Sequence, residues 1–401
     1  MRESIGYLAA LLSVRLVQLG LLVRFTGGRR VTSDIDRWLQ LAEAPWRSMF
    51  DPAMHDCAPL VGIGLALPIR PWLGLLPDEV ACRLGLVFWE IVAASFVLAT
   101  LRVMRPQARS ERVGIVMLWA LAPVTWMTSV VAAQDEVIVT AAMAAALYAW
   151  TRQRFVAAGV LAALATVGGK VFAVLMVASM FAAAPSRRLR HIVMATVPIL
   201  GLGYGGQWLA SIVQGGSIPL WSFRPPIDFG SSAWTWLVRE QLVDVSLARG
   251  LSSLLCVLAV SWVIAGTRGG GGVPDDSEGQ GLVSTWAAAT LLVLLLFYHV
   301  NPEYYLMVIP AVFVSPYALR TRAFVVFALS VPWLVNISYA ALWRIEAGLK
   351  DPISGLFLSA RSAEMAHEVS LALTVGATLG AVAWALMWWR HRRRRPISSR
   401  A

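Results

Sequence analysis

Apolar stretches separated by short polar ones follow one another along the whole chain. A helix that crosses the hydrocarbon core of a membrane needs about 20 apolar residues. The pattern therefore predicts an all-α integral membrane protein, a polytopic helical bundle with about 12 membrane helices in a single domain over residues 1–401. The stretches, several of them short, lie near residues 5–24, 80–101, 113–132, 137–150, 155–169, 171–184, 192–213, 247–266, 282–300, 304–318, 323–343 and 368–389.

The two stretches on either side of Lys170 are too short for ordinary crossings. Each holds only about 14 apolar residues, whereas a full span takes roughly 17–25. We therefore expect either two short membrane helices or a re-entrant pair that turns at Lys170.

The amino-acid composition places the chain among membrane proteins. Hydrophobic residues make up 58% of it, charged residues make up 14%, and the mean hydropathy is +0.66. One water-soluble core does not bury so much apolar surface. No small-residue cleavage site follows the first stretch, so we expect a retained helix rather than a signal peptide. The three cysteines are too few and too scattered for a disulfide framework or a sulfur-bound metal.

The net charge of +11 comes largely from arginines in short connections and near the end of the chain. Such arginines stay on the cytoplasmic side of a membrane, so this charge indicates topology rather than a nucleic-acid partner. Both termini are then cytoplasmic, as are a flexible glycine-rich linker at 267–281 and a basic tail at 390–401. The arginine-rich segments that set this orientation are 102–112, 152–154, 186–191, 319–322 and 390–395.

The opposite, outer side receives the chemically unusual residues. It holds the first outer loop at 25–79, the junction AAQDEV (132–137), Lys170 and the segment YHVNPEYY (298–305). Charged side chains at the ends of membrane helices are costly where they contact lipid. We therefore expect these side chains to share a polar cavity that faces outward.

Two aspartates, Asp34 and Asp36, stand in the segment VTSDIDRWLQLAEAPW (31–46), just after the first apolar stretch. The segment predicts an interfacial helix with Trp38 on its apolar side. One interpretation is that one aspartate caps this helix and the other is solvated. The alternative is a general base, because a carboxylate in a water-poor setting has a pKa that is raised toward the working range.

Several segments resemble the GT-C superfamily of membrane glycosyltransferases. SDIDRW, followed by APWRSM and HDCAPLVGIGL, is similar to the first outer loop of that family. The Asp-x-Asp pair is most similar to that of the GPI mannosyltransferase catalytic subunit and its bacterial relatives. The resemblance covers most of residues 5–215, and beyond them only HVNPEYYLMVIP resembles an outer segment of the family. Residues 45–59 depart from the family pattern, because the spacing to Pro45 is short and DCAP replaces an aromatic-Pro-Pro stretch.

The resemblance implies an inverting mannosyltransferase in the bacterial plasma membrane. It would move a sugar from a polyprenyl-phosphate donor to a hydroxyl of a lipid-linked glycan or glycolipid on the outer side. Such a transfer needs a base on the acceptor and positive charge or hydrogen bonds on the departing phosphate. The residues that fit these roles are Asp34 and Asp36 for catalysis, Lys170 and His299 for the donor phosphate, and Gln134, Asp135, Glu136 and Glu303 for the sugar or acceptor.

Plainer interpretations stay open for two of these residues. Lys170 could be a lysine that snorkels from a helix end. If Lys170 instead binds the donor phosphate, Lys170→Met is expected to fold, because it removes a costly unpaired charge, but to lose sugar transfer. His299 stands beside Tyr298, and a lone histidine in such a place is more often packed and hydrogen-bonded than in contact with a ligand.

Two other classes of protein fit parts of the same pattern. A lipid or solute transporter or flippase would carry charges along its whole depth, whereas here they gather at one end. A non-catalytic partner subunit of a glycosyltransferase would not need the aspartate pair. For an enzyme, the expected partners are the lipid donor, the glycan or glycolipid acceptor and the bilayer, and a small membrane partner subunit is compatible with the chain.

The sequence requires no cofactor. An Asp-x-Asp pair is able to bind a divalent cation through its carboxylate oxygens. A lipid monophosphate donor carries less charge than a nucleotide diphosphate, however, and needs such a cation less. We therefore assign no residue to a metal.

Overall fold

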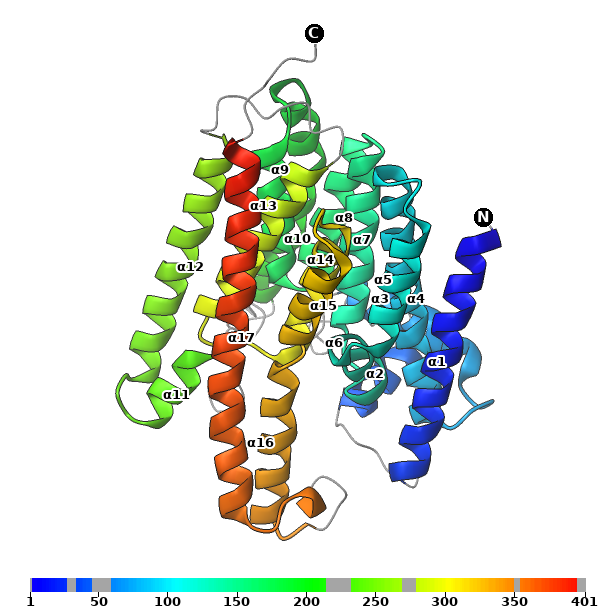
Figure 1. Cartoon of the computed structure of the whole chain (residues 1–401), viewed down its shortest axis with the longest axis vertical. Coiled ribbons are helices and arrows are strands. Elements are labelled where there is room, and N and C mark those ends of the chain that lie inside the picture. The colour runs from blue at the N-terminus through cyan, green and yellow to red at the C-terminus, as the bar shows by residue number, and fades with distance from the viewer. Residues whose placement is uncertain are drawn as a thin grey trace.

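The computed structural model describes residues 2–26, 34–44, 59–213, 232–268, 279–349 and 354–394. Within these ranges the chain forms helices and the connections between them, with no β-strand. Most of the helices run side by side along one direction and form a bundle, and the N and C labels both lie toward its upper end in Figure 1. The all-α prediction is therefore confirmed.

The first half of the bundle centres on one helix that is buried on nearly all sides. This helix, α7, packs against α4, α8 and the short helix η7. Its many alanines let the neighbouring helices approach closely. The helices of this half are α1 (Arg2–Thr26), α2 (Asp34–Glu43), α3 (Pro59–Ile69), η3 (Arg70–Trp72), α4 (Asp78–Met104), α5 (Arg109–Leu121), α6 (Pro123–Trp126), η4 (Met127–Val131), α7 (Glu136–Thr151), α8 (Phe155–Gly168), η5 (Val171–Ala173), α9 (Val174–Ala183) and α10 (Ser186–Val213).

The second half centres on α13, which packs against α9, α12 and α17. A hairpin of α16 and α17 extends below the rest of the bundle in Figure 1. The helices of this half are α11 (Ala233–Arg239), α12 (Val245–Arg268), α13 (Gln280–Leu296), η7 (Pro302–Val308), α14 (Ile309–Val314), α15 (Leu319–Ala328), α16 (Pro332–Glu346), η8 (Ser354–Leu356) and α17 (Ala360–Arg394).

Five helical segments of the described residues are long and apolar enough to cross a membrane. A sixth is a helix pair, 109–121 and 123–131, that bends by 57° at its break. Several apolar helices of 10–17 residues accompany them. The protein is therefore a multi-pass membrane protein by the length and composition of its helices, while the predicted count of about twelve crossings is not confirmed. The five segments are Glu3–Thr26, Asp78–Met104, Val245–Arg268, Leu319–Glu346 and Ala360–Arg392.

Helix α2 begins at Asp34 and carries the apolar side that its sequence predicts. That side is buried, and it packs in one cluster with residues of α3, α4 and α7. The apolar side of α2 is thus covered by protein. Residues 45–58, the part of the first outer loop that departs most from the GT-C pattern, lie outside the described residues.

Two segments that the sequence assigns to the cytoplasmic side are described only at their edges. Most of the linker at 267–281 lies outside the described residues, between the end of α12 and the start of α13. The basic tail at 390–401 begins as the last turns of α17, and residues 395–401 lie outside the described part.

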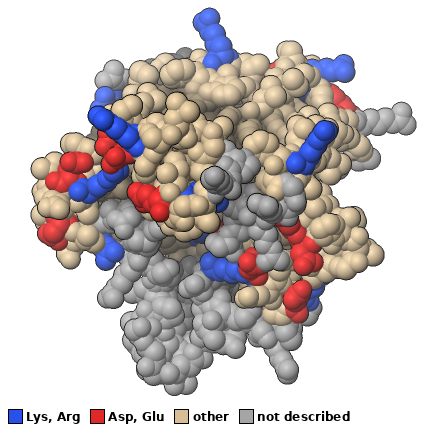
Figure 2. Space-filling view, turned by 90° about the horizontal axis from the view of Figure 1, so that it is seen from below, with Lys and Arg blue, Asp and Glu red and all other residues tan. Residues whose placement is uncertain are grey.

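Figure 2 shows the opposite, lower end of the bundle. Charged side chains of both signs lie close together there in several groups among uncharged residues.

Candidate functional site

A short turn after η4 presents three of the predicted site residues. Helix η4 is wound as a π-helix, in which Ala132 N–H donates to the carbonyl of Met127 at 2.7 Å. Ala133 then takes a positive φ of 53°, which reverses the chain before α7 begins at Glu136. π-helical turns occur frequently at functional sites. Gln134, Asp135 and Glu136 follow Ala133 directly in this turn.

Side chains from two other helices hold this turn in place. Trp38 of α2 donates from its indole Nε1 to the carbonyl of Ala133 at 2.6 Å. Arg83 of α4 donates to the carbonyl of Val131 at 2.7 Å and also to that of Val130. The turn therefore has its carbonyls satisfied by α2 and α4, and its position depends on both helices.

Asp34 lies against this turn. Gln134 donates from Nε2 to Oδ2 of Asp34 at 2.7 Å, although the two residues are 100 positions apart in the chain. Trp38 stands one helical turn after Asp34, on the same side of α2, and its own hydrogen bond to Ala133 fixes that side toward the turn.

Asp36 points in another direction. Two residues along a helix correspond to a rotation of about 200°, so Asp36 lies on the opposite side of α2 from Asp34. Asp36 is exposed, as are Gln40 and Glu43 on that side. The two aspartates of the pair therefore occupy different surroundings, and the Gln134 turn contacts Asp34.

Lys170 lies at the junction of α8 and η5 and reaches the same turn. Its Nζ is 3.1 Å from Oδ1 of Asp135 and 3.0 Å from Oε1 of Glu136, and it lies 5.9 Å from the ring centroid of Tyr304. Burial disfavours the charged ammonium, but the two carboxylates outweigh burial, so the pKa of Lys170 is well above its usual value. Lys170 is thus a cation paired with two acids.

Glu303 completes the group from the start of η7, outside the candidate membrane spans. It is 7% exposed, and burial raises its pKa to about 7, with the negative charge of Asp34 acting in the same direction and the charge of Lys170 against it. His299, four residues before Glu303, is also buried, and its ring is tilted against that of Tyr298, with centroids 6.3 Å apart. Glu303 thus interacts electrostatically with both Asp34 and Lys170.

We call the resulting group the Lys170 cluster; it consists of Asp34, Asp135, Glu136, Lys170 and Glu303. Two of its carboxylates, Asp135 and Glu136, pair with the ammonium group of Lys170, and Glu303 interacts electrostatically with both Lys170 and Asp34. Glu136 is fully buried, and its Oε2 has no hydrogen-bond partner among the described residues. Such a cluster can accept hydrogen bonds from hydroxyl groups or take up a proton. Within the described ranges no three His, Cys, Asp or Glu side chains are placed to share a metal ion.

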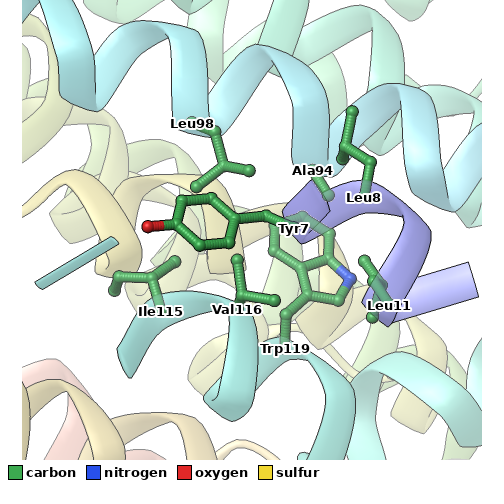
Figure 3. A pocket seen from close by; sticks show the side chains of 8 residues that line it. All are labelled: Tyr7, Leu8, Leu11, Ala94, Leu98, Ile115, Val116 and Trp119. Carbon is green, nitrogen blue, oxygen red and sulfur yellow. The ribbon is translucent and has the colours of Figure 1, made fainter. Parts of the chain in front are cut away.

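A small pocket between α1, α4 and α5 has no part in this cluster. Its lining is mainly apolar, and Figure 3 shows Tyr7 and Trp119 facing it together with aliphatic side chains. None of its lining residues belongs to the Lys170 cluster. A pocket of this character suits an apolar group and offers no chemistry to a polar substrate.

Sequence reasoning missed three charged residues that the structure buries among the helices. Arg15 and Glu90 form a buried ion pair inside the bundle, and Arg83 holds the 132–136 turn. Each stands within a long apolar stretch, and ionisable residues inside such stretches are usually functional. A charged residue inside an apolar stretch was therefore the sequence signal that could have identified Arg15, Arg83 and Glu90.

The comparisons with known proteins add no family to this description. No protein-family model matches the chain, and no curated protein matches it.

Proposed function

We propose that the chain is a polyprenyl-phosphate-dependent glycosyltransferase, a mannosyltransferase by resemblance, of the GT-C type. The observation that carries the proposal is the hydrogen bond to Asp34 from Gln134, 100 residues away in the chain, next to Asp135 and Glu136, which pair with Lys170. A carboxylate that is held in place beside buried polar groups is suited to act as a general base. The resemblance to the GT-C family supplies the reaction.

In the proposed reaction, Asp34 accepts the proton of the acceptor hydroxyl. The oxygen of that hydroxyl forms a bond to the anomeric carbon, and the bond from this carbon to the donor phosphate breaks, which inverts the configuration. Gln134 orients Asp34 by its hydrogen bond at 2.7 Å. Asp36, on the exposed side of α2, is a poor candidate for the base and is assigned a secondary role.

The charge of the cluster favours the sugar over the phosphate as its ligand. Lys170 is already paired with Asp135 and Glu136 at 3.1 and 3.0 Å. A phosphate would have to displace one of these carboxylates, against the remaining negative charge. Hydroxyl groups of a sugar, by contrast, are donors to the buried Oε2 of Glu136 and to the Glu303 carboxyl group. We assign the sugar to these acidic residues and leave the phosphate to His299 and to a rearranged Lys170.

The proposal places this site on the outer side of a bacterial plasma membrane, with both chain termini in the cytoplasm. It follows from the arginine-rich connections, which stay on the cytoplasmic side of a membrane. The acceptor is then a lipid-linked glycan or a glycolipid. The proposed reaction requires no metal ion, because a lipid monophosphate donor carries less charge than a nucleotide diphosphate and needs a cation less.

A transporter is the second candidate function. Buried carboxylates that pair with a lysine mark ion and proton pathways in transport proteins, and the Lys170 cluster is a group of this kind. Uptake or release of a lipid-linked sugar by proteoliposomes without any acceptor would favour this candidate. Transfer of the sugar to an acceptor would favour the enzyme.

The test is a radiolabel assay with purified protein and a series of polyprenyl-phosphate sugars. Asp34→Asn keeps the size of the side chain and an oxygen that accepts from Gln134, but it removes the proton acceptor. Turnover should fall by about 10²–10⁴-fold, the usual contribution of a general base, while donor binding is kept. Asp36→Asn, a matched change on the exposed side of the same helix, should cost much less.

Two results would count against the enzyme. A well-folded Asp34→Asn/Asp36→Asn double variant that transfers sugar at a normal rate would remove the proposed mechanism. Absence of transfer from every polyprenyl-phosphate sugar tested, with folded wild-type protein, would remove the proposed activity.

A further inference from the structure

A buried ion pair joins α1, at the edge of the bundle in Figure 1, to α4. Arg15 is 0% exposed and Glu90 is 1% exposed, and Nε of Arg15 donates to both carboxylate oxygens of Glu90, at 2.9 and 2.8 Å. Burying an ion pair away from water costs free energy unless the remaining donors and acceptors of both side chains also form hydrogen bonds. The remaining partners of the pair therefore indicate what holds it there.

The guanidinium group of Arg15 satisfies carbonyls that a helix break leaves without donors. Pro123 has no N–H, so the carbonyl of Trp119, four residues earlier, loses its helical partner. The N–H of Val124 donates to Ser330 instead of continuing the helix. Arg15 donates to the carbonyls of Trp119 and Ala120, each at 2.8 Å. Arg15 is thus fitted to the break between α5 and α6.

Glu90 extends the same network into η4. It accepts a hydrogen bond from Trp119 Nε1 at 2.8 Å and one from Ser129 Oγ at 2.6 Å. Ser129 lies within η4, and the neighbouring carbonyl of Thr128 accepts from the N–H of Gln134 at 2.9 Å. Hydrogen bonds therefore link Arg15 through Glu90 to Ser129 of η4, and the adjacent carbonyl of Thr128 links η4 to the turn that contacts Asp34.

We propose that Arg15 and Glu90 are positioning residues for the candidate site, acting through Ser129 on the π-helical turn. They fix η4 against α1 and α4, and η4 in turn sets where Gln134 meets Asp34 and where Glu136 meets Lys170. The placement of the turn stands on the geometry alone, whereas its effect on sugar transfer rests on the proposed function.

The first test measures the position of the turn without any substrate. Asp34→Cys and Gln134→Cys are introduced together into a chain whose three native cysteines are replaced by alanine, and the rate of their oxidative cross-linking is measured. Glu90→Gln removes the charge that binds Arg15, and Ser129→Ala removes only the hydroxyl that links η4 to Glu90. Each should slow cross-linking by about tenfold, the lower limit for losing a hydrogen bond to a charged group.

Ser179→Ala is the matched control for the serine change. Ser179 is as fully buried as Ser129, but within the described part of the chain its hydroxyl donates only to the carbonyl of Leu175 in its own helix, at 2.6 Å. This control should cross-link at the unaltered rate. If Glu90→Gln fails to fold, Ser129→Ala alone decides, because its fold retains the whole Arg15–Glu90 pair.

Sugar transfer supplies the second measurement. In the native-cysteine chain, Ser129→Ala should lower kcat with the KM for the donor little changed, since a displaced turn misplaces Asp34 without removing a donor contact. Cross-linking of Ser129→Ala and Glu90→Gln at the wild-type rate would overturn the positioning role. If both variants cross-link slowly but folded wild-type protein transfers no sugar, the positioning role stands and the proposed function is overturned.

Discussion

Lys170 balances the charge of the candidate site at the scale of single residues. Its ammonium group pairs with the carboxylates of Asp135 and Glu136, which are 4% and 0% exposed. Removal of one partner from a buried ion pair leaves the other charge uncompensated. Here the removal of one lysine would leave two carboxylates uncompensated in the same turn.

We therefore expect Lys170→Met to destabilise the protein. The loss should be about 3 kcal/mol, the lower end of the range for breaking a buried pair, because 29% of the Lys170 side chain is exposed. Thermal unfolding in detergent measures it. The double variant Lys170→Met/Glu136→Gln should regain part of the loss, since it also removes one of the stranded carboxylates.

The exposed pair of Arg239 and Glu364 is the control for this change. Nη2 of Arg239 lies 2.9 Å from Oε1 of Glu364, but both side chains are more than a third exposed. Exposed ion pairs of this kind contribute at most about 1 kcal/mol to the free energy of unfolding. Arg239→Met should hardly alter the melting temperature. A Lys170→Met protein as stable as the wild type would contradict the charge balance described for the site.

The sequence allowed the residues of the cluster to be chosen but not their pairing. Asp34 is predicted from its general-base chemistry and from the resemblance to the GT-C aspartate pair, whereas Gln134, Asp135, Glu136, Lys170 and Glu303 are predicted because polar side chains at helix ends avoid lipid. Lys170 was treated as an unpaired charge whose loss would leave folding intact, and its two acidic partners reverse the sign of that expectation. The sequence predicted which side of α2 is apolar but not that α3, α4 and α7 cover that side.

At the scale of elements, the junction of α8 and η5 depends on the lack of a side chain at Gly169. A Cβ atom there would lie 2.6 Å from the carbonyl oxygen of Ala165 and 2.6 Å from Cγ2 of Val139 on α7. Contacts this short force the backbone or the neighbour to move. The close approach of the junction to α7 is what lets Lys170 reach Glu136 at the start of that helix.

Gly169→Ala should consequently destabilise the protein by about 1–3 kcal/mol, the usual effect of overpacking. Gly201→Ala in α10 is the control, because a Cβ atom at Gly201 meets nothing within 4 Å. That change should be neutral or stabilise by about 0.5–1 kcal/mol, since alanine favours the helix. Equal melting temperatures for the two variants would argue against a close-packed junction.

The positions of the helices were predicted more accurately where the apolar stretches are long and unbroken. The long apolar helices α1, α4, α12 and α17 lie where the sequence places apolar stretches. The stretch at 113–132 was taken as one crossing, whereas the structure bends it by 57° at Pro123. The proline was visible in the sequence, but a bend also needs partners for the freed carbonyls. Thr125 supplies one for Trp119, and the others come from Arg15, which is more than 100 residues away.

At the scale of the whole molecule, the orientation of the bundle decides whether the candidate site faces outward. The connection from α4 to α5 and the helix α11 lie at opposite ends of the bundle (Figure 1). Gln107 is exposed in the first of these places and Glu240 in the second. A cysteine at each position can therefore report on which side of the membrane its end lies.

We expect a membrane-impermeant thiol reagent added to intact cells to label Glu240→Cys and to miss Gln107→Cys. The host chain has its native cysteines replaced, and lysed cells serve as the control in which both positions should react. The arginine-rich connection at 102–112 predicts this result through the positive-inside rule. The reverse labelling pattern would put the candidate site in the cytoplasm and remove the outward-facing proposal.

The buried pair of Arg15 and Glu90 also constrains how the chain enters the membrane during synthesis. The two residues are 75 positions apart, so α1 leaves the ribosome well before Glu90 has been made. An arginine in the middle of a lone helix costs about 2.5–3.5 kcal/mol on insertion scales, although α1 as a whole is apolar enough to span the membrane. The first helix therefore bears this cost until α4 supplies Glu90, which favours insertion of the two helices as a pair.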